Sequence, residues 1–446
     1  MEITDKEKQK SLRYSLWDGA FYSVMIGFGE SFFAPFAVLL KASDWQLGIL
    51  GTIPQTLGSI CQLLSVKVLE LFHSRKMMTV MGAALQGLLY LPMILCLDMS
   101  EYSVEVFLLM VALYTMAGAI IGPVWNSWMG DLLNEDERAR YFAKRNRING
   151  LTTLIGFYLA GLILHYFSES NADKLGFMLL FFAACLMRLI SAACLMKKCE
   201  PPQQSEESAY LSPTEFLSRI RGSNYLTFLK WQILMNFAVF LSAPFFSAYM
   251  LKSLNLSYSA YTLVCTLPIL TKMLAMPLLG RMIDRFGGRR MLSVGGLLMP
   301  FSSVLWIFSG DVWWLCLAQI YAGLVWGCVE LSVFSFVYDA TKSRNRTAYV
   351  AYSTVLGGIS TLLGSATGAA VLHYFSWLSS PYHLIFLLST VLRLTVSLIY
   401  LPQIREERKV RSIRTEDLLI KMIGSMTNRG LTYSLIIMKR HWHRRR

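Results

Sequence analysis

Twelve separate runs of apolar residues, each long enough to cross a lipid bilayer, constrain this chain more than any other feature. A helix needs about 20 apolar residues to cross the hydrocarbon core, and only helices or closed barrels satisfy their backbone groups in lipid. Only 16% of the residues are charged, against roughly 25% in soluble domains. We therefore expect an all-α membrane protein with twelve transmembrane helices. The predicted spans are 17–40, 45–66, 77–97, 104–128, 148–167, 175–196, 226–251, 258–279, 291–308, 313–337, 348–375 and 381–401.

The positions of the basic residues predict how the chain is oriented. The net charge is +14, and the basic residues lie in short segments between the apolar runs. If both termini are cytoplasmic, 35 of the 42 Lys and Arg residues lie on the cytoplasmic side. Cytoplasmic loops carry such an excess, so the charge reflects topology and not nucleic-acid binding. We expect a multi-pass protein of the cell (inner) membrane with both termini cytoplasmic.

Several chemical classes find no support in the sequence. The eight cysteines form no CxxC pair and no Cys/His cluster, so we expect neither a disulfide framework nor a metal site. No phosphate-binding loop of the G-x-x-x-x-G-K-[ST] kind is present, which argues against ATP-driven pumping. No nucleophile and base pattern emerges, so we expect no enzyme activity and no cofactor.

An internal repeat divides the chain into two halves. The sequence His165–Ser168, HYFS, recurs at 373–376, and Ala34-Pro35-Phe36 aligns with Ala243-Pro244-Phe245. Two parallel six-helix repeats imply a pseudo-two-fold axis along the membrane normal, about which the halves can rock. The expected division is an N-terminal half at 1–196, a cytoplasmic linker at 197–224, a C-terminal half at 225–402 and a basic cytoplasmic tail at 403–446.

The loop between the eighth and ninth spans carries the most specific motif. It contains Gly280, Asp284, Arg285, Gly287, Gly288, Arg289 and Arg290. Gly280 would let a neighbouring helix approach closely, and the two later glycines would permit a tight turn at positive φ. Asp284 would lie near a helix N-terminus, where the dipole favours an anion. The loop resembles the G-x-x-x-D-R-x-G-R-R signature of the major facilitator superfamily, with one extra glycine. The resemblance implies a bacterial-type permease with this fold.

The resemblance also implies charged latches at the cytoplasmic side. The corresponding loop of the first half keeps an acid, Glu70, and a basic pair that begins with Arg75, but lacks the glycines. Two acid-x6-Arg pairs resemble those of sugar porters in this superfamily. The pairs are Asp131 with Arg138 and Asp339 with Arg346. The resemblance implies that these charges form gating contacts with the loop motifs, and it carries no information about the substrate.

Glu30 is the strongest candidate for a residue that binds a proton during transport. It lies near the middle of the first span, where a charge costs about 3 kcal/mol on insertion scales. The neighbouring glycines and Pro35 suggest a helix that bends. We expect Glu30 to face a central cavity and to be protonated during transport; the alternative is a neutral side chain hydrogen-bonded between helices.

Other polar residues within spans are weaker candidates for the cavity. They are Trp125, Asn126, Asn236, Lys272 and Glu330, of which the last two can instead pair with each other. Arg188 and Arg393 occupy spans six and twelve, which are peripheral in the fold that the resemblance implies. We expect these two arginines to extend toward the membrane interface.

The sequence therefore predicts a secondary active transporter that moves a small solute by alternating access. Glu30 is the candidate for proton coupling. A non-transporting receptor or a lipid scramblase on the same fold is the alternative. The expected partners are a small-molecule substrate, protons and the lipid bilayer, without nucleic acid, and we expect a monomer.

Overall fold

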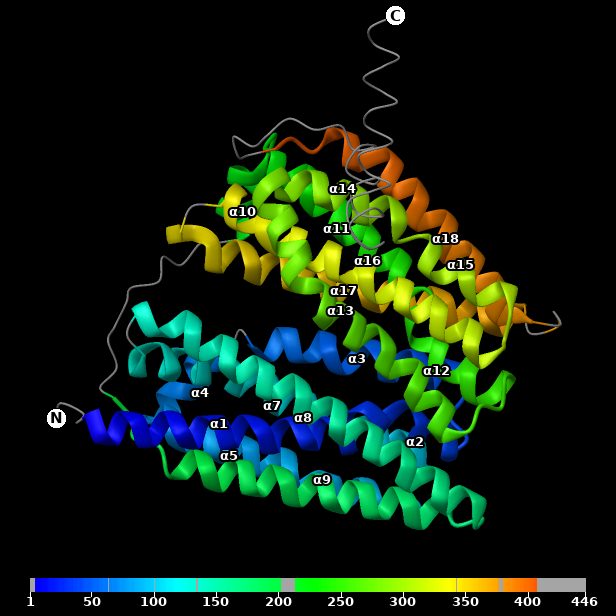
Figure 1. Ribbon diagram of the computed structural model, residues 1–446, viewed down its shortest axis with the longest axis horizontal. Coiled ribbons are helices and arrows are strands. Elements are labelled where there is room, and N and C mark those ends of the chain that lie inside the picture. Colours follow the sequence, from blue (N-terminus) through cyan, green and yellow to red (C-terminus); the bar gives the residue numbers. More distant parts are fainter. Residues whose placement is uncertain are drawn as a thin grey trace, which may run out of the picture.

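The fold is known from a computed structural model that describes residues 5–62, 64–99, 101–133, 135–201, 213–341, 343–375, 377 and 380–406. Helices account for nearly all of these residues, and none of the described residues forms a strand. The predicted basic tail lies almost entirely outside this range, as does the central part of the linker. We call the face of the bundle where the chain begins the terminal face, and the other the opposite face (Figure 1).

The N-terminal half contains six membrane-crossing units. The first is interrupted at Gly29, where the absence of a side chain leaves room for Tyr90, whose hydroxyl would lie 2.3 Å from an added Cβ. The helices of this half are α1 (Asp5–Phe28), η1 (Glu30–Phe32), α2 (Phe33–Leu39), α3 (Asp44–Gln62), α4 (Ser65–Phe72), α5 (Arg75–Leu88), α6 (Tyr90–Leu95), α7 (Ser103–Leu132), α8 (Glu135–Glu169) and α9 (Asp173–Met196).

The C-terminal half repeats this order after the short helix α10 (Pro213–Ile220). Its first unit is also interrupted, around Pro244, which aligns with Pro35. The helices are α11 (Asn224–Phe240), η2 (Ala243–Phe245), α12 (Phe246–Ala248), η3 (Tyr249–Ser253), α13 (Tyr258–Phe286), α14 (Gly288–Leu298), α15 (Phe301–Phe308), α16 (Val312–Ala340), α17 (Ser343–Tyr374), α18 (Pro381–Tyr400) and η4 (Leu401–Gln403).

Equivalent glycines pack equivalent helices together in both halves. In the N-terminal half, a Cβ added at Gly156 of α8 would lie 3.2 Å from the Val24 oxygen of α1. In the C-terminal half, a Cβ added at Gly364 of α17 would lie 2.4 Å from the Phe237 oxygen of α11. The repeat in the sequence is therefore a repeat of helix packing, because small residues let helix backbones approach closely in membranes.

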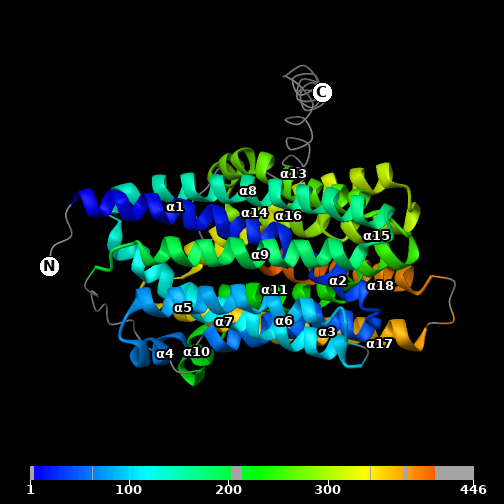
Figure 2. The same cartoon turned by 90° about the horizontal axis from the view of Figure 1, so that it is seen from below.

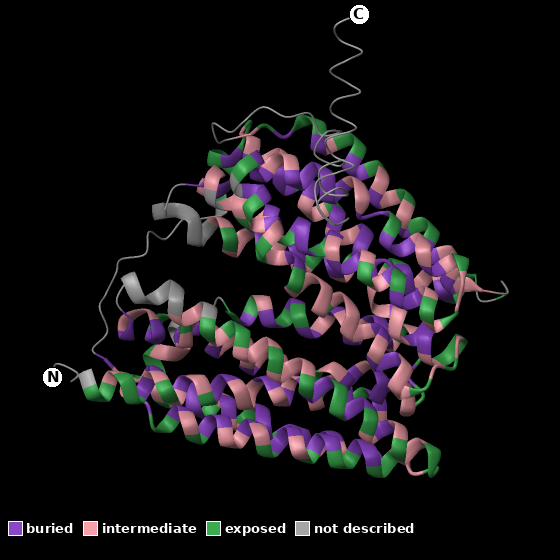
Figure 3. Ribbon diagram, in the orientation of Figure 1, coloured by how far each residue is buried: buried purple, intermediate pink, exposed green. Residues whose placement is uncertain are grey.

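The surface of the bundle is typical of a protein surrounded by lipid. Eleven stretches of described helix are long and apolar enough to cross a membrane. The one predicted span missing from these eleven is 45–66, which corresponds to α3. This helix is less apolar because of its threonines and glutamines, and it lies beside α7 and α17. Exposed positions recur along the outer helices (Figure 3). Large apolar side chains occupy many exposed positions, such as Phe182 of α9 and Val391 of α18.

The two halves are joined at the opposite face. Their ribbons lie close together around α2 and α12 and separate toward the terminal face (Figure 1). Lys252 donates to the Ala42 oxygen at 2.7 Å and contacts the Asp44 carboxylate at 3.2 Å. Tyr382 donates to the same carboxylate at 3.0 Å. Deeper in the membrane, Ser365 donates to the Gly48 oxygen at 2.8 Å. The structure therefore represents a conformation that is closed at the opposite face.

Candidate functional site

Glu30 lies directly after the interruption of the first span, as its sequence context predicts. Gly29 ends the regular helix, and Glu30 begins the single turn η1. The Glu30 side chain is exposed, although it lies within the span Lys6–Leu39. The hydroxyl of Tyr114 on α7 donates to its carboxylate at 3.0 Å. An exposed carboxylate within a span, with a hydroxyl beside it, can gain and lose a proton.

A buried arginine, Arg188, lies near this carboxylate. Arg188 of α9 is only 4% exposed and lies close enough for its charge to act on Glu30. Two of its nitrogens donate to the Gln86 side-chain oxygen at 3.1 and 2.6 Å. Its guanidinium also lies 4.5 Å from the centre of the Tyr22 ring. The expectation that Arg188 extends toward the membrane interface was wrong, because the side chain finds acceptors within the bundle.

The network around Arg188 continues to a second buried acid. Arg188 donates to Ser191 at 2.9 Å, and Ser191 donates to the Asp18 carboxylate at 2.7 Å. Arg145 of α8 contacts the same carboxylate at 3.4 Å. Asp18 is 3% exposed, so the ion pair is shielded from water. Sequence reasoning missed this network, although an acid and an arginine inside two spans were visible as a signal.

The equivalent arginine of the C-terminal half has different surroundings. Arg393 is 2% exposed, so the expectation that it extends to the interface was wrong here too. It donates to Ser302 at 3.1 Å and to Ser242 at 3.0 Å. Among the described residues no carboxylate contacts Arg393. Hydroxyls and the carbonyl of Val239 surround this cation instead.

The weaker cavity candidates do not gather around Glu30. Trp125 lies between two cations, with Arg145 at 4.2 Å and Lys198 at 5.4 Å from its ring centre. Burial lowers the pKa of Lys198, just beyond the end of α9, to about 8. Asn126, beside Trp125, is exposed. Trp125 therefore helps to fix the terminal end of the N-terminal half.

The remaining candidates lie in the C-terminal half. Lys272 of α13 and Glu330 of α16 form an ion pair at 2.9 Å, which was the alternative considered for them. Asn236 of α11 lies against Gly357, where an added Cβ would meet its amide nitrogen at 3.1 Å. The pairing of Lys272 with Glu330 connects two helices of one half.

At the terminal face, Arg75 makes the most extensive set of contacts. It is 2% exposed and contacts Asp131 at 2.5 Å, as the resemblance implied. It also donates to the Pro201 oxygen at 2.7 Å. Its backbone nitrogen donates to the Glu200 carboxylate at 2.6 Å, and Ser74, the N-cap of α5, donates to the other oxygen of that carboxylate. Arg75 therefore fixes the chain where it leaves the N-terminal half, a role that the sequence did not reveal.

Arg289 occupies the equivalent place in the C-terminal half. It donates to the Ile404 oxygen at 2.8 Å and to the Leu401 oxygen at 3.5 Å, just past α18. Arg290 contacts the Phe286 oxygen at 3.5 Å, and Arg285 lies 5.4 Å from the ring of Phe286. Each half therefore uses one loop arginine to hold the chain that follows its last helix.

The glycines of this loop differ from one another in role. Gly287 has φ of +93°, which confirms the expected turn at positive φ. Gly288 was also expected in the turn, but it begins α14 and packs against Ser335, which would lie 3.1 Å from an added Cβ. No described atom lies within 4 Å of a Cβ added at Gly280, so the expected close helix contact is not found among the described residues. The ribbons of the two halves diverge toward this face (Figure 1).

Several predicted latch residues make few contacts that can be described. Glu70 is exposed, and Ser335 donates to Asp339 at 3.4 Å. The side chains of Asp284, Arg138 and Arg346 lie outside the part of the structure that can be described.

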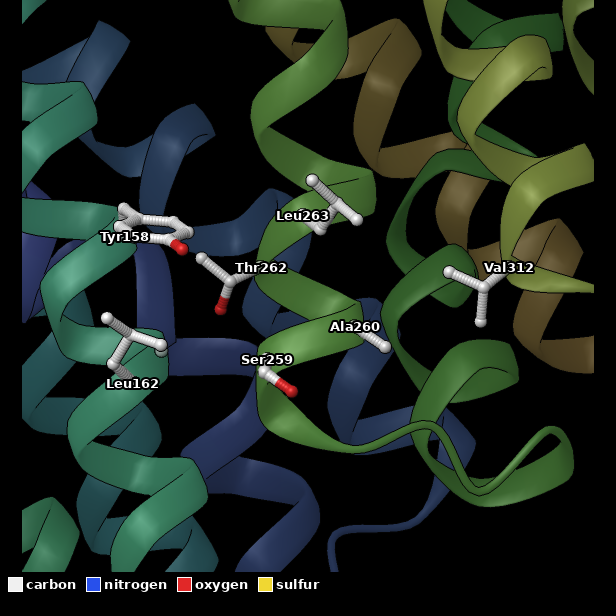
Figure 4. A pocket seen from close by; sticks show the side chains of 8 residues that line it. Tyr158, Leu162, Ser259, Ala260, Thr262, Leu263 and Val312 are labelled. Atoms are coloured by element: carbon white, nitrogen blue, oxygen red, sulfur yellow. The ribbon is translucent and has the colours of Figure 1, made fainter.

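A pocket of about 260 Å³ lies apart from Glu30, between α8 and α13 (Figure 4). Residues of both halves form its walls, including Tyr158, Leu162 and Thr262. No charged side chain lines it, so it offers no group for proton transfer.

Comparisons with known proteins agree with this architecture. The model of the Major Facilitator Superfamily matches residues 19–242 and 231–439. A nucleoside transporter NupG variant superimposes with a TM-score of 0.70 at 13% identity, covering 89% of this chain and 100% of its own. A D-xylose-proton symporter superimposes with a TM-score of 0.66 at 14% identity, covering 91% of this chain and 99% of its own. An inward-facing bacterial homologue of the human lysosomal transporter Spinster superimposes with a TM-score of 0.67 at 14% identity, covering 92% of this chain and 100% of its own. No curated protein matches the sequence significantly.

Proposed function

Because this chain belongs to the Major Facilitator Superfamily, and is thus a secondary transporter and not an enzyme, we propose that it couples solute movement to protons through Glu30. The observation that carries the proposal is the exposed Glu30 carboxylate at the interruption of the first span, with the Tyr114 hydroxyl 3.0 Å away. The solute is a small molecule that enters between the two halves. The chain works as a monomer, since each half already has its partner within the same chain.

The physical basis is the cost of a charge within the membrane. A carboxylate at the centre of a span costs about 3 kcal/mol, so a nearby cation and a hydroxyl donor help to keep it ionised. Arg188 supplies the positive charge, and Tyr114 supplies the donor. When the cavity closes around Glu30, water no longer stabilises the charge, and the protonated form is favoured. Protonation and closure therefore favour each other.

The orientation follows from the distribution of basic residues. We assign the terminal face to the cytoplasm of a cell with an inner membrane, which places both termini and the linker there. The described conformation is then inward-facing, because the contacts between Asp44, Lys252 and Tyr382 close the opposite side. The boundaries proposed from the sequence, 1–196 and 225–402, correspond to the two halves that rock against each other.

The loop motifs act as cytoplasmic latches in this mechanism. Arg75 and Asp131 hold the N-terminal half together at its cytoplasmic end. Gly280 and Asp284 would meet the other half only when the cytoplasmic ends come together. Contacts between exposed charges of the two halves would be worth about 0–1 kcal/mol each, so several could bias one state without preventing the switch.

Flux measurements test the proposal. The purified protein is first tested for thermal stabilisation by a panel of small solutes, and each stabilising solute is then offered to proteoliposomes with and without an inward proton gradient. We expect accumulation that depends on the gradient. Binding without any flux would identify a receptor, and lipid movement without solute flux would identify a scramblase.

The variant Glu30→Gln separates coupling from transport. It should exchange solute across the membrane but fail to accumulate it against a gradient, because Gln cannot release a proton. Glu101→Gln is the matched control, since Glu101 is an exposed acid between α6 and α7. Normal proton-driven accumulation by Glu30→Gln would exclude Glu30 from coupling.

A further inference from the structure

The seam between α8 and α13 presents an apolar surface to the membrane. On α8, large side chains at helical spacing are 42–69% exposed, and they form a stripe along one face of the helix. They are Ile155, Tyr158, Leu159, Leu162 and Tyr166. Figure 2 shows α8 and α13 side by side along one edge of the bundle. Because both helices are membrane spans, lipid covers this stripe.

The pocket interrupts this stripe near the opposite face. Tyr158 and Leu162 extend from α8, Ser259 and Leu263 from α13, and Val312 begins α16 (Figure 4). These residues belong to the spans Lys144–Glu169, Tyr258–Ile283 and Val312–Val337, so the pocket lies within the depth of the membrane. Its volume of about 260 Å³ is below the roughly 300–1,000 Å³ of sites that hold a whole drug-sized ligand. A single slender chain fits it better.

The inner wall of the pocket is closed by close packing between the two halves. A Cβ added at Gly161 would lie 2.1 Å from the Thr262 hydroxyl oxygen, so no space remains between α8 and α13 at this level. Thr262 is 1% exposed. The pocket therefore opens toward lipid and does not continue to Glu30.

Two of the three side-chain hydroxyls in the wall are already hydrogen-bonded, and the third belongs to Tyr158. The Thr262 hydroxyl donates to the Tyr258 oxygen at 2.7 Å. The Ser259 hydroxyl pairs with Ser257 at 3.1 Å. With no charge and few free hydrogen-bonding groups, the pocket selects an apolar ligand.

We propose that this pocket binds one acyl chain of a phospholipid from the membrane leaflet at the opposite face. Ser259 is the second residue of α13, so the pocket begins close to that membrane surface and can receive a chain whose headgroup stays outside. Because α8 and α13 come from different halves, the pocket exists only while the halves are together at this end. A bound chain therefore stabilises the described conformation by binding to it selectively.

Photochemical labelling in lipid nanodiscs tests the proposal. The probe is phosphatidylethanolamine with a diazirine near the end of one acyl chain, and the labelled peptides are identified by mass spectrometry. We expect labelling concentrated in residues 158–162 and 259–263. In Ala260→Phe, whose added ring fills the pocket, labelling there should fall about tenfold or more, as for a loss of about 1.4 kcal/mol in binding.

Leu159→Phe is the matched control, because Leu159 lies on the same exposed stripe but does not line the pocket. It should retain the labelling of the unmodified protein. If Ala260→Phe does not fold, Leu263→Trp provides a second filled pocket. Equal labelling of the filled variant and the control would mean ordinary lipid contact only and would overturn the proposal. Labelling by a diazirine fatty acid but not by the phospholipid would overturn it as well.

Discussion

The two halves share one fold but differ in the charges that they bury. By the alignment of Ala34 with Ala243, Asp18 corresponds to Thr227 and Glu30 to Val239. Arg188 therefore lies near two acids, whereas the equivalent Arg393 contacts hydroxyls and a carbonyl. Both halves therefore use the arginine in packing. The acids occupy these positions in the N-terminal half alone, which is where we propose the proton chemistry.

Removing Arg188 should produce the largest effect on stability. Arg188→Met deletes a buried cation that reaches Asp18 through Ser191. We expect a loss of about 3 kcal/mol, at the lower end of the range for a broken buried pair, because Arg145 remains beside Asp18. Thermal unfolding in detergent measures the loss. An unchanged melting temperature would show that the buried acid does not depend on Arg188.

Removing the contact of Arg75 with Asp131 should produce the second-largest loss of stability. Asp131→Asn removes a charged acceptor from an arginine that is 2% exposed, and we expect a cost of about 2 kcal/mol. Thermal unfolding in detergent measures this cost too. An unchanged melting temperature of Asp131→Asn would show that Arg75 is held without its carboxylate partner.

Arg393 provides the contrasting test. Arg393→Met should change stability by less than about 1 kcal/mol, since an apolar residue of similar volume often replaces a buried ion without loss. Ser242 and Ser302 would keep other acceptors, the Val239 and Met299 oxygens. Melting temperatures of Arg188→Met and Arg393→Met, compared directly, decide whether the halves differ as described. A loss as large as that of Arg188→Met would contradict the comparison.

The smallest effect concerns the contact between the halves. Asp44→Asn weakens a half-exposed ion pair with Lys252, worth about 0–1 kcal/mol. Hydrogen exchange at the start of α3 should become faster, because the opposite face opens more often. Glu105→Gln is the control, since Glu105 contacts Gln46 at 2.8 Å within one half. If both variants exchange equally fast, Asp44 does not act as a gate.

Periodicity and charge predicted most of the fold, but not the buried network. Apolar runs located the membrane helices, and the repeat indicated two halves, because both are patterns of residue type that need no knowledge of side-chain contacts. The contact of Arg75 with Asp131 followed from a motif in the loops. The assembly of Asp18, Gln86 and Arg188 could not be predicted, since it depends on how three helices rotate about their axes. The close contact expected at Gly280 was not found, since the packing at that position depends on how the helices are arranged at the terminal face and not on the motif alone.

The charge state of Glu30 can be measured without knowledge of the substrate. Infrared difference spectra of the reconstituted protein, recorded between acidic and alkaline pH, detect the carbonyl stretch of each carboxylic acid that titrates. We predict that a band of the unmodified protein is absent from Glu30→Gln and present in the control Glu101→Gln. Identical difference spectra for Glu30→Gln and the unmodified protein would contradict the claim that Glu30 exchanges protons.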